Sequence, residues 1–416
     1  MMSFENKLQG ACIIGQSGGP TAVINASAYG AIRAALDADC ITRVYGAANG
    51  IKGVLNDQLY IMDEGDPAEL QYLRNTPSSE LGSCRYKMKD PDTDDTDYQR
   101  ILEIFKKYNV RYFFYNGGND SMDTCNKISK YCQKVGYECR VMGIPKTIDN
   151  DLFGTDHCPG YASAAKYIAT SCMEISKDAG VYDTPQITVI EIMGRDAGWL
   201  TAASALATKF GAGPDLIYLP EVDFDTEQFF ADVEQIYKAK GKVLIAVSEG
   251  IHYADGSLVS EAKTSATDGF GHAQLGGLAA KLADALKQKF NTKVRGIELS
   301  LLQRCGAHLA SATDVTEAEL AGRTAVEQAV TGMTDRMVAF KCDRTGGNYT
   351  CTTELLPLSA VANYVKKVPL EWINEDHNGV TEDLISYVLP LIQGQPERPT
   401  ENSLPRYAKL KKILAK

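Results

Sequence analysis

The sequence predicts an α/β protein with mostly parallel sheets and a chain divided into two lobes. Short apolar runs typical of buried strands alternate with helical patterns over most of the chain, as in βαβ units. The chain has 416 residues, more than one ordinary hydrophobic core holds, so two domains are expected. Glycine and small polar residues follow several of the apolar runs, at the strand ends where such folds bind ligands.

The individual elements follow from hydrophobic length and period. Strands are expected where four to six apolar or β-branched residues run together, at residues 11–14, 110–115, 139–144, 187–192, 216–219 and 243–247. Helices are expected where apolar residues recur at helical spacing, at residues 22–36, 162–175, 200–209, 226–238 and 276–287. The basic end of the chain, residues 409–416, is expected to form a frayed, solvated helix.

Two strand ends in the first half have the composition of an anion site. Residues 15–21 read Gly-Gln-Ser-Gly-Gly-Pro-Thr, and residues 116–121 read Asn-Gly-Gly-Asn-Asp-Ser. Adjacent glycines let the backbone approach an anion, and a helix start offers unpaired N–H groups and the positive end of the helix dipole. Neither segment matches GxxxxGK[ST] or completes GxGxxG, so ordinary tight βα turns remain an alternative for each.

A third strand end, residues 145–151, is the most informative segment of the chain. It reads Pro-Lys-Thr-Ile-Asp-Asn-Asp and follows the strand expected at 139–144. Clustered charges lose solvation and repel one another unless they face a ligand. The alternative is a polar loop in which Asp149 caps a helix. Taken together, the three strand ends predict a phosphate-and-metal site at the mouth of a parallel sheet.

The second half has polar clusters of its own at strand ends. Arg195 follows the strand expected at 187–192, and Glu249 follows the one at 243–247. Arg295 and Arg304 bracket a further apolar run. An arginine beside a glycine can present a planar fork to a phosphate. Surface ion pairs for the arginines and a core hydrogen bond for Glu249 are the alternatives.

Composition narrows the class of protein. Hydrophobic content of 44% and charged content of 23% are typical of globular proteins. A net charge of −10 argues against a general nucleic-acid or membrane-surface binder. The 11 cysteines include no CxxC pair, which indicates scattered thiols in a reducing compartment. No apolar run approaches the ~20 residues that span a bilayer, and residues 1–7 lack the pattern of a secretory signal, so a cytoplasmic location is expected.

These segments, in this order from Gly18 to Arg304, resemble the phosphofructokinase family. The resemblance covers about two thirds of the chain and rests on co-occurring motifs. The motifs are Ser-Gly-Gly with Asn-Ala (17–19, 25–26), Gly-Ser-Cys-Arg (82–85), Gly-Gly-Asn-Asp-Ser (117–121), Thr-Ile-Asp-Asn-Asp (147–151), Met-Gly-Arg (193–195), Glu-Gly (249–250) and Gln-Arg (303–304). Diacylglycerol and NAD kinases share a Gly-Gly-Asp-type turn but lack Thr-Ile-Asp-Asn-Asp and Met-Gly-Arg.

The resemblance implies two Rossmann-like three-layer α/β/α lobes with the active site in the cleft between them. The phosphoryl-donor lobe would comprise residues 1–160 with 303–345, and the fructose 6-phosphate lobe residues 161–302. Residues 346–416, which lie beyond the part covered by the resemblance, are expected to form a largely helical C-terminal extension.

Two positions bear on the phosphoryl donor. Family members that use ATP have Gly-Gly-Asp-Gly-Ser in the turn and a glycine before Thr-Ile-Asp-Asn-Asp, where this chain has Asp120 and Lys146. A carboxylate at residue 120 would repel the α-phosphate of a nucleotide, and Lys146 would supply positive charge where the transferring and leaving phosphates develop negative charge. The resemblance therefore implies pyrophosphate as donor, with reversible formation of fructose 1,6-bisphosphate and phosphate in glycolysis or gluconeogenesis.

The resemblance also implies a role for each site residue. Asp149 would take the proton of the C1 hydroxyl of fructose 6-phosphate, since phosphoryl transfer needs mainly alignment and charge neutralisation. The implied catalytic residues are Asp149, Lys146, Asp120, Thr147 and Arg195. The implied donor-binding residues are Gly18, Gly19, Arg85, Gly118 and Ser121. The implied substrate-binding residues are Thr147, Ile148, Asp149, Asp151, Met193, Gly194, Arg195, Glu249, Arg295, Leu301 and Arg304.

Mg²⁺ is the implied cofactor, and a homodimer or homotetramer is expected, with Arg295 reaching in from a neighbouring subunit.

Four positions depart from the family pattern. Asn119 stands at the Mg²⁺ position usually held by Asp, and Leu301 stands where many members have His. Gln186 replaces a phosphate-binding Arg of bacterial ATP-using enzymes, and Cys305 interrupts Arg-Gly-Gly. The alternatives are an ATP-dependent enzyme, one that prefers sedoheptulose 7-phosphate, or a non-catalytic paralogue that binds sugar phosphates.

Overall fold

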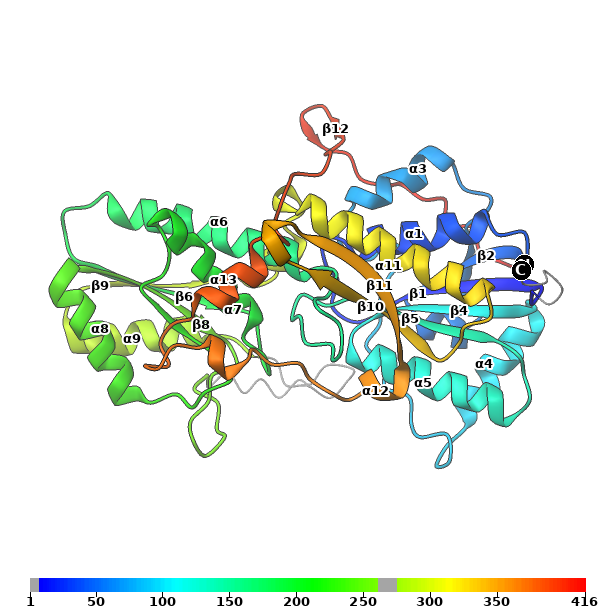
Figure 1. The fold of residues 1–416 in the computed structure, drawn as a ribbon, viewed down its shortest axis with the longest axis horizontal. Helices are drawn as coiled ribbons and strands as arrows, with labels where there is room; N and C mark the ends of the chain where they lie inside the picture. The colour runs from blue at the N-terminus through cyan, green and yellow to red at the C-terminus, as the bar shows by residue number, and fades with distance from the viewer. Residues whose placement is uncertain (1–6, 261–274) are drawn as a thin grey trace.

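The structure, a computed structural model, describes residues 7–260 and 275–416. It contains two α/β lobes side by side, each built around one main sheet (Figure 1). In the first lobe the strand order is β11-β10-β5-β4-β1-β2-β3, and in the second it is β7-β8-β6-β9.

The centre of the first sheet is parallel. It is formed by β1 (Gly10–Gln16), β2 (Ile41–Ala47), β4 (Val110–Gly117) and β5 (Arg140–Pro145). The edges are mixed: β3 (Leu59–Ile61) is antiparallel to β2, β10 (Arg336–Asp343) is parallel to β5, and β11 (Thr350–Pro357) is antiparallel to β10. Every residue of β1 is buried. Burial on both faces explains why this strand is continuously apolar rather than alternating.

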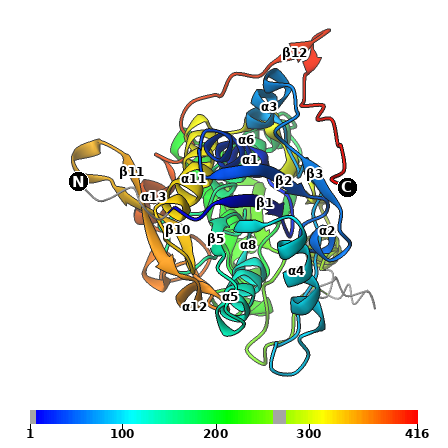
Figure 2. The same ribbon diagram turned by 90° about the vertical axis from the view of Figure 1, so that its right-hand side faces the viewer.

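Helices cover both faces of the first sheet. On one face, α1 (Ile24–Leu36) and α11 (Ala312–Val330) pack on alternate residues of the strands, Cys12 and Ile14 among them. On the other face, α4 (Thr96–Lys107) and α5 (Asn119–Lys134) pack on the intervening residues. Figure 2 shows the sheet between these two helix layers. The lobe is therefore a three-layer α/β/α sandwich.

The second lobe has the same layered plan with a smaller sheet. Its strands β6 (Gln186–Ile192), β7 (Leu216–Tyr218), β8 (Lys242–Ser248) and β9 (Lys293–Glu298) are all parallel. One face is covered by α6 (Tyr161–Gly180) and α7 (Trp199–Ala203), and the other by α8 (Thr226–Lys240) and α9 (Leu278–Phe290). The predicted fold class is confirmed, and the strands expected from the sequence fall on β1, β4, β5, β6, β7 and β8.

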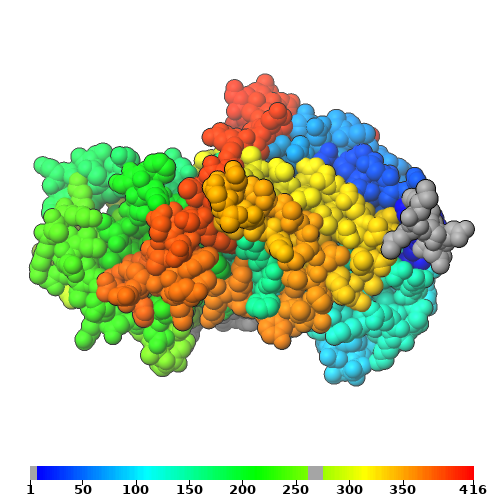
Figure 3. All heavy atoms as spheres, viewed as in Figure 1, coloured from blue at the N-terminus to red at the C-terminus, as the bar shows by residue number. Residues whose placement is uncertain are grey.

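The expectation of a largely helical extension at residues 346–416 is wrong. Its helices are short: α12 (Leu358–Val361), η5 (Leu370–Trp372) and α13 (Glu382–Val388). Its first part is β11, which joins the first sheet. Beyond β11 the segment runs across both lobes, as the orange-to-red surface in Figure 3 shows. Contacts with both lobes therefore outweigh the local preference for helix.

The frayed terminal helix expected at residues 409–416 is also wrong. The tail is extended and lies beside the edge strand β3, where the Ile61 N–H donates to the Ile413 carbonyl at 2.8 Å and the Ala415 N–H donates to the Leu59 carbonyl at 2.8 Å. An edge strand presents unpaired backbone groups, and the tail satisfies them.

The predicted lobe limits, residues 1–160 with 303–345 and residues 161–302, remain a proposal. The strands of the main sheets fall inside them, except for β11.

Residues 1–6, part of the region considered for a secretory signal, lie outside the described residues. In the described part of the chain, no helix is both long and apolar enough to cross a membrane.

Candidate active site

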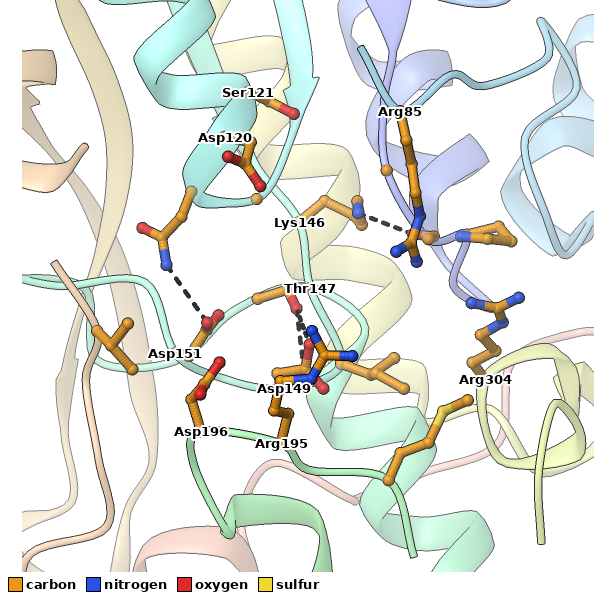
Figure 4. A pocket seen from close by; sticks show the side chains of 18 of the residues that line it. Arg85, Asp120, Ser121, Lys146, Thr147, Asp149, Asp151, Arg195, Asp196 and Arg304 are labelled. Atoms are coloured by element: carbon orange, nitrogen blue, oxygen red, sulfur yellow. Dashed lines mark hydrogen bonds between the residues drawn. The ribbon is translucent and has the colours of Figure 1, made fainter. Parts of the chain in front are cut away.

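A cavity of about 360 Å³ lies where the carboxyl ends of the two sheets face each other. Figure 4 shows its polar lining at close range. The cavity gathers most of the residues predicted for the site. They are Gly18, Gly19, Arg85, Gly118, Asn119, Asp120, Ser121, Lys146, Thr147, Ile148, Asp149, Asp151, Met193, Arg195, Glu249 and Arg304.

The loop after β5 carries the two carboxylates of the cavity floor. Its turn is made by Asn150, whose φ of 56° lies in the left-handed region that Asn tolerates better than most residues. The Asn150 side chain is buried, accepts from the Cys158 N–H at 2.9 Å and donates to the Tyr387 hydroxyl at 2.9 Å. These two hydrogen bonds fix the turn, so that Asp149 and Asp151 both reach the cavity (Figure 4).

The surroundings of Asp149 suit a carboxylate that acts as a general base. The Thr147 hydroxyl donates to Asp149 Oδ2 at 3.2 Å, and the Asp149 N–H donates back to Thr147 Oγ1 at 3.1 Å. Burial raises the pKa of Asp149, and the charge of Lys146 opposes that rise. Burial and the neighbouring Asp149 raise the pKa of Asp151 to about 7. The two carboxyls therefore take up protons more readily than exposed ones.

Lys146 joins this loop to the glycine turn after β1. Its side chain is 4% exposed, and Nζ donates to the Gly19 carbonyl at 2.8 Å. Burial lowers the pKa of Lys146 to about 8, against the effect of Asp149. A lysine so placed is charged at neutral pH and points at the backbone where an anion would bind.

Two arginines complete a cationic cluster around Gly19. A Cβ added to Gly19 would lie 3.1 Å from Arg304 Nη1 and 3.6 Å from Arg85 Nη2, so glycine keeps the space between the guanidinium groups open. Burial and then the nearby Arg85 lower the pKa of Arg304. Like charges gathered this closely favour the binding of an anion such as phosphate. Arg304, predicted for the sugar phosphate, thus lies beside the predicted donor-binding Arg85.

The turn after β4 brings an amide and a carboxylate to the cavity at the start of α5. Gly117 is required because a Cβ there would lie 2.0 Å from Ser121 Oγ. Asn119 Nδ2 donates to Asp151 Oδ2 at 3.3 Å, whereas Asn119 Oδ1 is buried with no hydrogen-bond partner among the described residues. Buried polar atoms are usually paired, so this oxygen has the character of a ligand for a hard cation. Asp120 lines the cavity beside it.

The second lobe contributes the loops after β6 and β8. The Gly194 N–H donates to Glu249 Oε1 at 3.3 Å, and the Gly194 carbonyl accepts from Ser248 Oγ at 2.6 Å. Burial raises the pKa of Glu249 to about 7. Met193, Arg195 and Glu249 line the cavity from this side.

Gly194, Arg295 and Leu301 do not line the cavity formed by the described residues. A Cβ at Gly194 would lie 2.7 Å from Ser248 Oγ, so glycine at this position allows the loop after β6 to pack closely against Ser248. Arg295 lies on β9, the edge strand of the second sheet, and is exposed. Leu301 is 53% exposed. Placement of these last two at the site stays a prediction, which for Arg295 requires a neighbouring subunit.

Three lining residues were missed: Pro20, Asp196 and Val365. The first two directly follow recognised motifs, and their neighbours could have identified them. Val365 comes from the C-terminal extension and forms an isolated antiparallel bridge with Leu152. No local pattern indicates a contact between segments so far apart in sequence.

The segment around Val365 ties both lobes together beside the cavity. The Lys366 N–H donates to the Asp151 carbonyl at 2.8 Å, and its Nζ donates to the Asp156 carbonyl at 2.7 Å. The Lys366 carbonyl accepts from Trp199 Nε1 of the second lobe at 2.9 Å. The extension therefore braces the catalytic loop against the opposite lobe.

A cleft between two α/β lobes that gathers a buried carboxylate, a lysine and two arginines around glycine turns defines a phosphotransferase. Residues 11–329 match the family model described as phosphofructokinase. The chain belongs to the phosphofructokinase family.

Individual relatives extend the similarity over nearly the whole chain. A protein of Halomonas elongata named pyrophosphate--fructose 6-phosphate 1-phosphotransferase is 46% identical over 401 residues, covering 95% of each chain. A protein of the same name from Methylococcus capsulatus is 42% identical over 400 residues, covering 95% of this chain and 94% of the relative. The crystal structure of a pyrophosphate-dependent phosphofructokinase from Nitrosospira multiformis superposes with a TM-score of 0.89 at 38% identity, covering 98% of each chain.

Proposed function

We propose that this protein transfers a phosphoryl group from pyrophosphate to the C1 hydroxyl of fructose 6-phosphate. The products are fructose 1,6-bisphosphate and phosphate, and the step is reversible within glycolysis and gluconeogenesis. The observation that carries the proposal is Lys146, buried between Asp149 and the Gly19 carbonyl, with Asp120 on the neighbouring turn. The names of the relatives from Halomonas elongata and Methylococcus capsulatus support the same donor.

In this reaction Asp149 accepts the proton of the C1 hydroxyl while that oxygen attacks the terminal phosphorus of pyrophosphate. The bond between this phosphorus and the bridging oxygen breaks, and the leaving group departs as phosphate. Thr147, which donates to Asp149 Oδ2, keeps the carboxylate oriented toward the hydroxyl. Such proton transfer typically contributes 10²–10⁴-fold in rate.

Lys146 and Arg85 hold the donor against the turn of Gly18 and Gly19. Charge builds on the bridging and equatorial oxygens during transfer, and a fixed ammonium group offsets it without reorganisation. In a nucleotide-using enzyme, contacts to the nucleoside and α-phosphate share this task. Here Asp120 places a negative charge near that region, which disfavours a nucleotide and leaves room for the smaller donor.

The oxygens around Asn119 fit a magnesium ion. Asn119 Oδ1, which has no hydrogen-bond partner in the described part of the chain, and the carboxylate of Asp151 would hold it, with Asp120 on the adjacent turn. When bound, Mg²⁺ neutralises charge on the oxygens of the donor. The amide brings no charge of its own, so the affinity for Mg²⁺ depends more on the bound pyrophosphate and on the carboxylates of Asp120 and Asp151.

The sugar-phosphate half is completed by Met193, Arg195, Glu249 and Arg304, with Arg295 supplied by a second subunit of a homodimer or homotetramer. The exposure of Arg295 on an edge strand supports this assembly.

A cytoplasmic location is supported by the 11 cysteines, which are all free thiols in the structure.

A coupled assay tests the proposal. Purified protein with Mg²⁺ and fructose 6-phosphate is supplied with pyrophosphate or ATP, and fructose 1,6-bisphosphate is followed through aldolase. Turnover is expected with pyrophosphate, and a parallel assay with sedoheptulose 7-phosphate measures acceptor preference. Turnover with ATP and none with pyrophosphate would overturn the donor, and binding of fructose 6-phosphate without turnover on either donor would indicate a non-catalytic paralogue.

A further inference from the structure

Two cysteines face each other on the outer strands of the first sheet, away from the residues that line the cavity. Cys342 of β10 and Cys351 of β11 are direct partners in the antiparallel register, and both are half-buried. Opposed residues in antiparallel strands have Cα atoms about 4.5 or 5.5 Å apart and point to the same face. Disulfides span Cα separations of about 4.4–6.8 Å. The register therefore permits a bond between the two sulfurs without rearrangement of the sheet.

The surroundings of Cys342 favour the thiolate. Its Sγ lies 3.7 Å from His157 Nδ1. The Tyr349 hydroxyl, 3.4 Å from the same sulfur, donates its proton to Glu317 Oε1 at 2.6 Å, so the imidazole is the group that favours the thiolate. His157 is fully buried between two carboxyls, with Nδ1 3.0 Å from Asp156 Oδ1 and Nε2 2.7 Å from Glu317 Oε2. Although burial acts to lower it, hydrogen bonds to these partners raise the pKa of His157 well above its ordinary value. Cys342 thus sits beside an imidazolium.

The two sulfurs differ in acidity. The hydrogen bond from Cys351 and the adjacent imidazolium lower the pKa of Cys342 to about 6 despite burial. The same pairing raises the pKa of Cys351. At neutral pH one sulfur is thus an anion and its neighbour a thiol, the arrangement found where one cysteine attacks an oxidant and a second one resolves the product.

A divalent metal is a competing occupant, because ligand atoms of Asp156, His157 and Cys342 lie within 4.8 Å of one another. The ion pairs disfavour it. Both nitrogens of His157 already face carboxylates, and Arg344 donates to both oxygens of Asp156 at 2.7 and 2.8 Å. A protonated ring has no lone pair to offer a metal.

We propose that Cys342 and Cys351 are a peroxide-responsive thiol pair. The Cys342 thiolate attacks one oxygen of hydrogen peroxide, forming a sulfenic acid and releasing hydroxide, which takes up a proton to become water. The Cys351 thiol then attacks the Cys342 sulfur, forming the S–S bond as a second water leaves. In total two thiols and one peroxide yield one disulfide and two waters, and a dithiol reductant reverses the step.

Peptide mapping of the full chain tests this pair against an internal control. Reduced protein is exposed to hydrogen peroxide, alkylated and digested with trypsin, which cleaves after Lys341 and Arg344 and so separates the two cysteines. The expected product is a cross-link between the peptides that carry Cys342 and Cys351, lost after treatment with dithiothreitol. Cys305, which is exposed and whose sulfur contacts the Leu302 carbonyl, is the control.

The relative rates of oxidation at Cys342 and Cys305 test the proposal. Thiolates and not thiols attack peroxide, so oxidation at Cys342, whose sulfur lies beside the imidazolium of His157, is expected to be severalfold faster than at Cys305. The pair is refuted if Cys342 and Cys351 both remain alkylated after Cys305 has reacted. One equivalent of tightly bound zinc in the purified protein, lost in Cys342→Ser, would show a metal site instead.

The order of attack is tested with two single variants. In Cys351→Ser the sulfenic acid at Cys342 cannot be resolved, and dimedone is expected to trap it on the peptide that carries Cys342. In Cys342→Ser no dimedone adduct is expected at Cys351. The reverse labelling pattern would overturn the assignment of Cys342 as the attacking sulfur.

Discussion

The donor side and the sugar-phosphate side of the cavity differ in how completely one chain builds them. The donor side comes from turns after β1, β4 and β5, strands at the centre of the first sheet. The sugar-phosphate side comes from turns after β6 and β8, while Arg295 on the edge strand β9 is exposed. Strands buried on both faces fix the direction of the residues that follow them, whereas an edge strand leaves its side chains available to a partner. We therefore expect changes on the donor side to act within one chain and changes at Arg295 to act between chains.

The largest effect is expected at the base. Asp149→Ala removes the acceptor for the C1 proton, and kcat with pyrophosphate should fall about 10³-fold. Binding of fructose 6-phosphate, followed by calorimetry, should change little, because other residues hold the sugar phosphate. Full turnover in this variant would refute the role of Asp149.

Lys146 should show the next largest effect, confined to the donor. Lys146→Met keeps most of the side-chain volume and removes the charge beside the Gly19 carbonyl. We expect kcat/KM for pyrophosphate to fall about 100-fold, equivalent to about 2.7 kcal/mol of transition-state stabilisation. Lys146→Arg, which keeps the charge, is the matched control. Equal losses in both variants would mean that shape and not charge matters at this position.

Arg295 distinguishes the two sides most sharply. Arg295→Ala should raise KM for fructose 6-phosphate about tenfold and leave KM for pyrophosphate unchanged. Mixing this variant with Asp149→Ala should produce active sites with the native KM for fructose 6-phosphate, because a mixed dimer contains one site with both native residues. If subunit exchange is shown by mass spectrometry and all remaining activity keeps the raised KM, Arg295 does not act across an interface.

The pH profile of kcat/KM provides a smaller but informative effect. Asp149 must be ionised to accept a proton, and burial raises its pKa, so the acid limb of the profile should lie at higher pH than that of an ordinary aspartate. Lys146 must be protonated, and burial lowers its pKa to about 8, so activity should fall as pH rises through about 8. Lys146→Arg should move the alkaline limb upward, since guanidinium stays charged. An unmoved alkaline limb would show that another group causes it.

Much of the donor side could be predicted from the sequence because its signals are local. A buried strand followed by glycines or by Thr-Ile-Asp-Asn-Asp marks a site residue within a few positions, and Lys146, Asp149 and Asp120 all line the cavity. Val365 and Lys366 could not be found this way. They reach the catalytic loop through contacts with Leu152 and Asp151, more than 200 positions away, and their own neighbourhood resembles a surface loop.

The C-terminal tail, residues 409–416, shows that a local pattern can also predict an element that does not form. Its Lys-Leu pattern favours helix locally, yet residues 413 and 415 pair with β3 because an edge strand needs partners. Local preference is a weak guide wherever a distant segment offers unpaired backbone groups.

Donor selection by Asp120 is tested most directly by one ratio: kcat/KM for pyrophosphate divided by kcat/KM for ATP, in the native protein and in Asp120→Gly. Asp120→Asn serves as the control for size without charge. Because juxtaposed like charges cost several kcal/mol, the native ratio should be at least about 10³ and should fall about tenfold or more in Asp120→Gly. A native protein that prefers ATP, or a ratio that is the same in the native protein and in Asp120→Gly, would contradict the role of this carboxylate in excluding nucleotides.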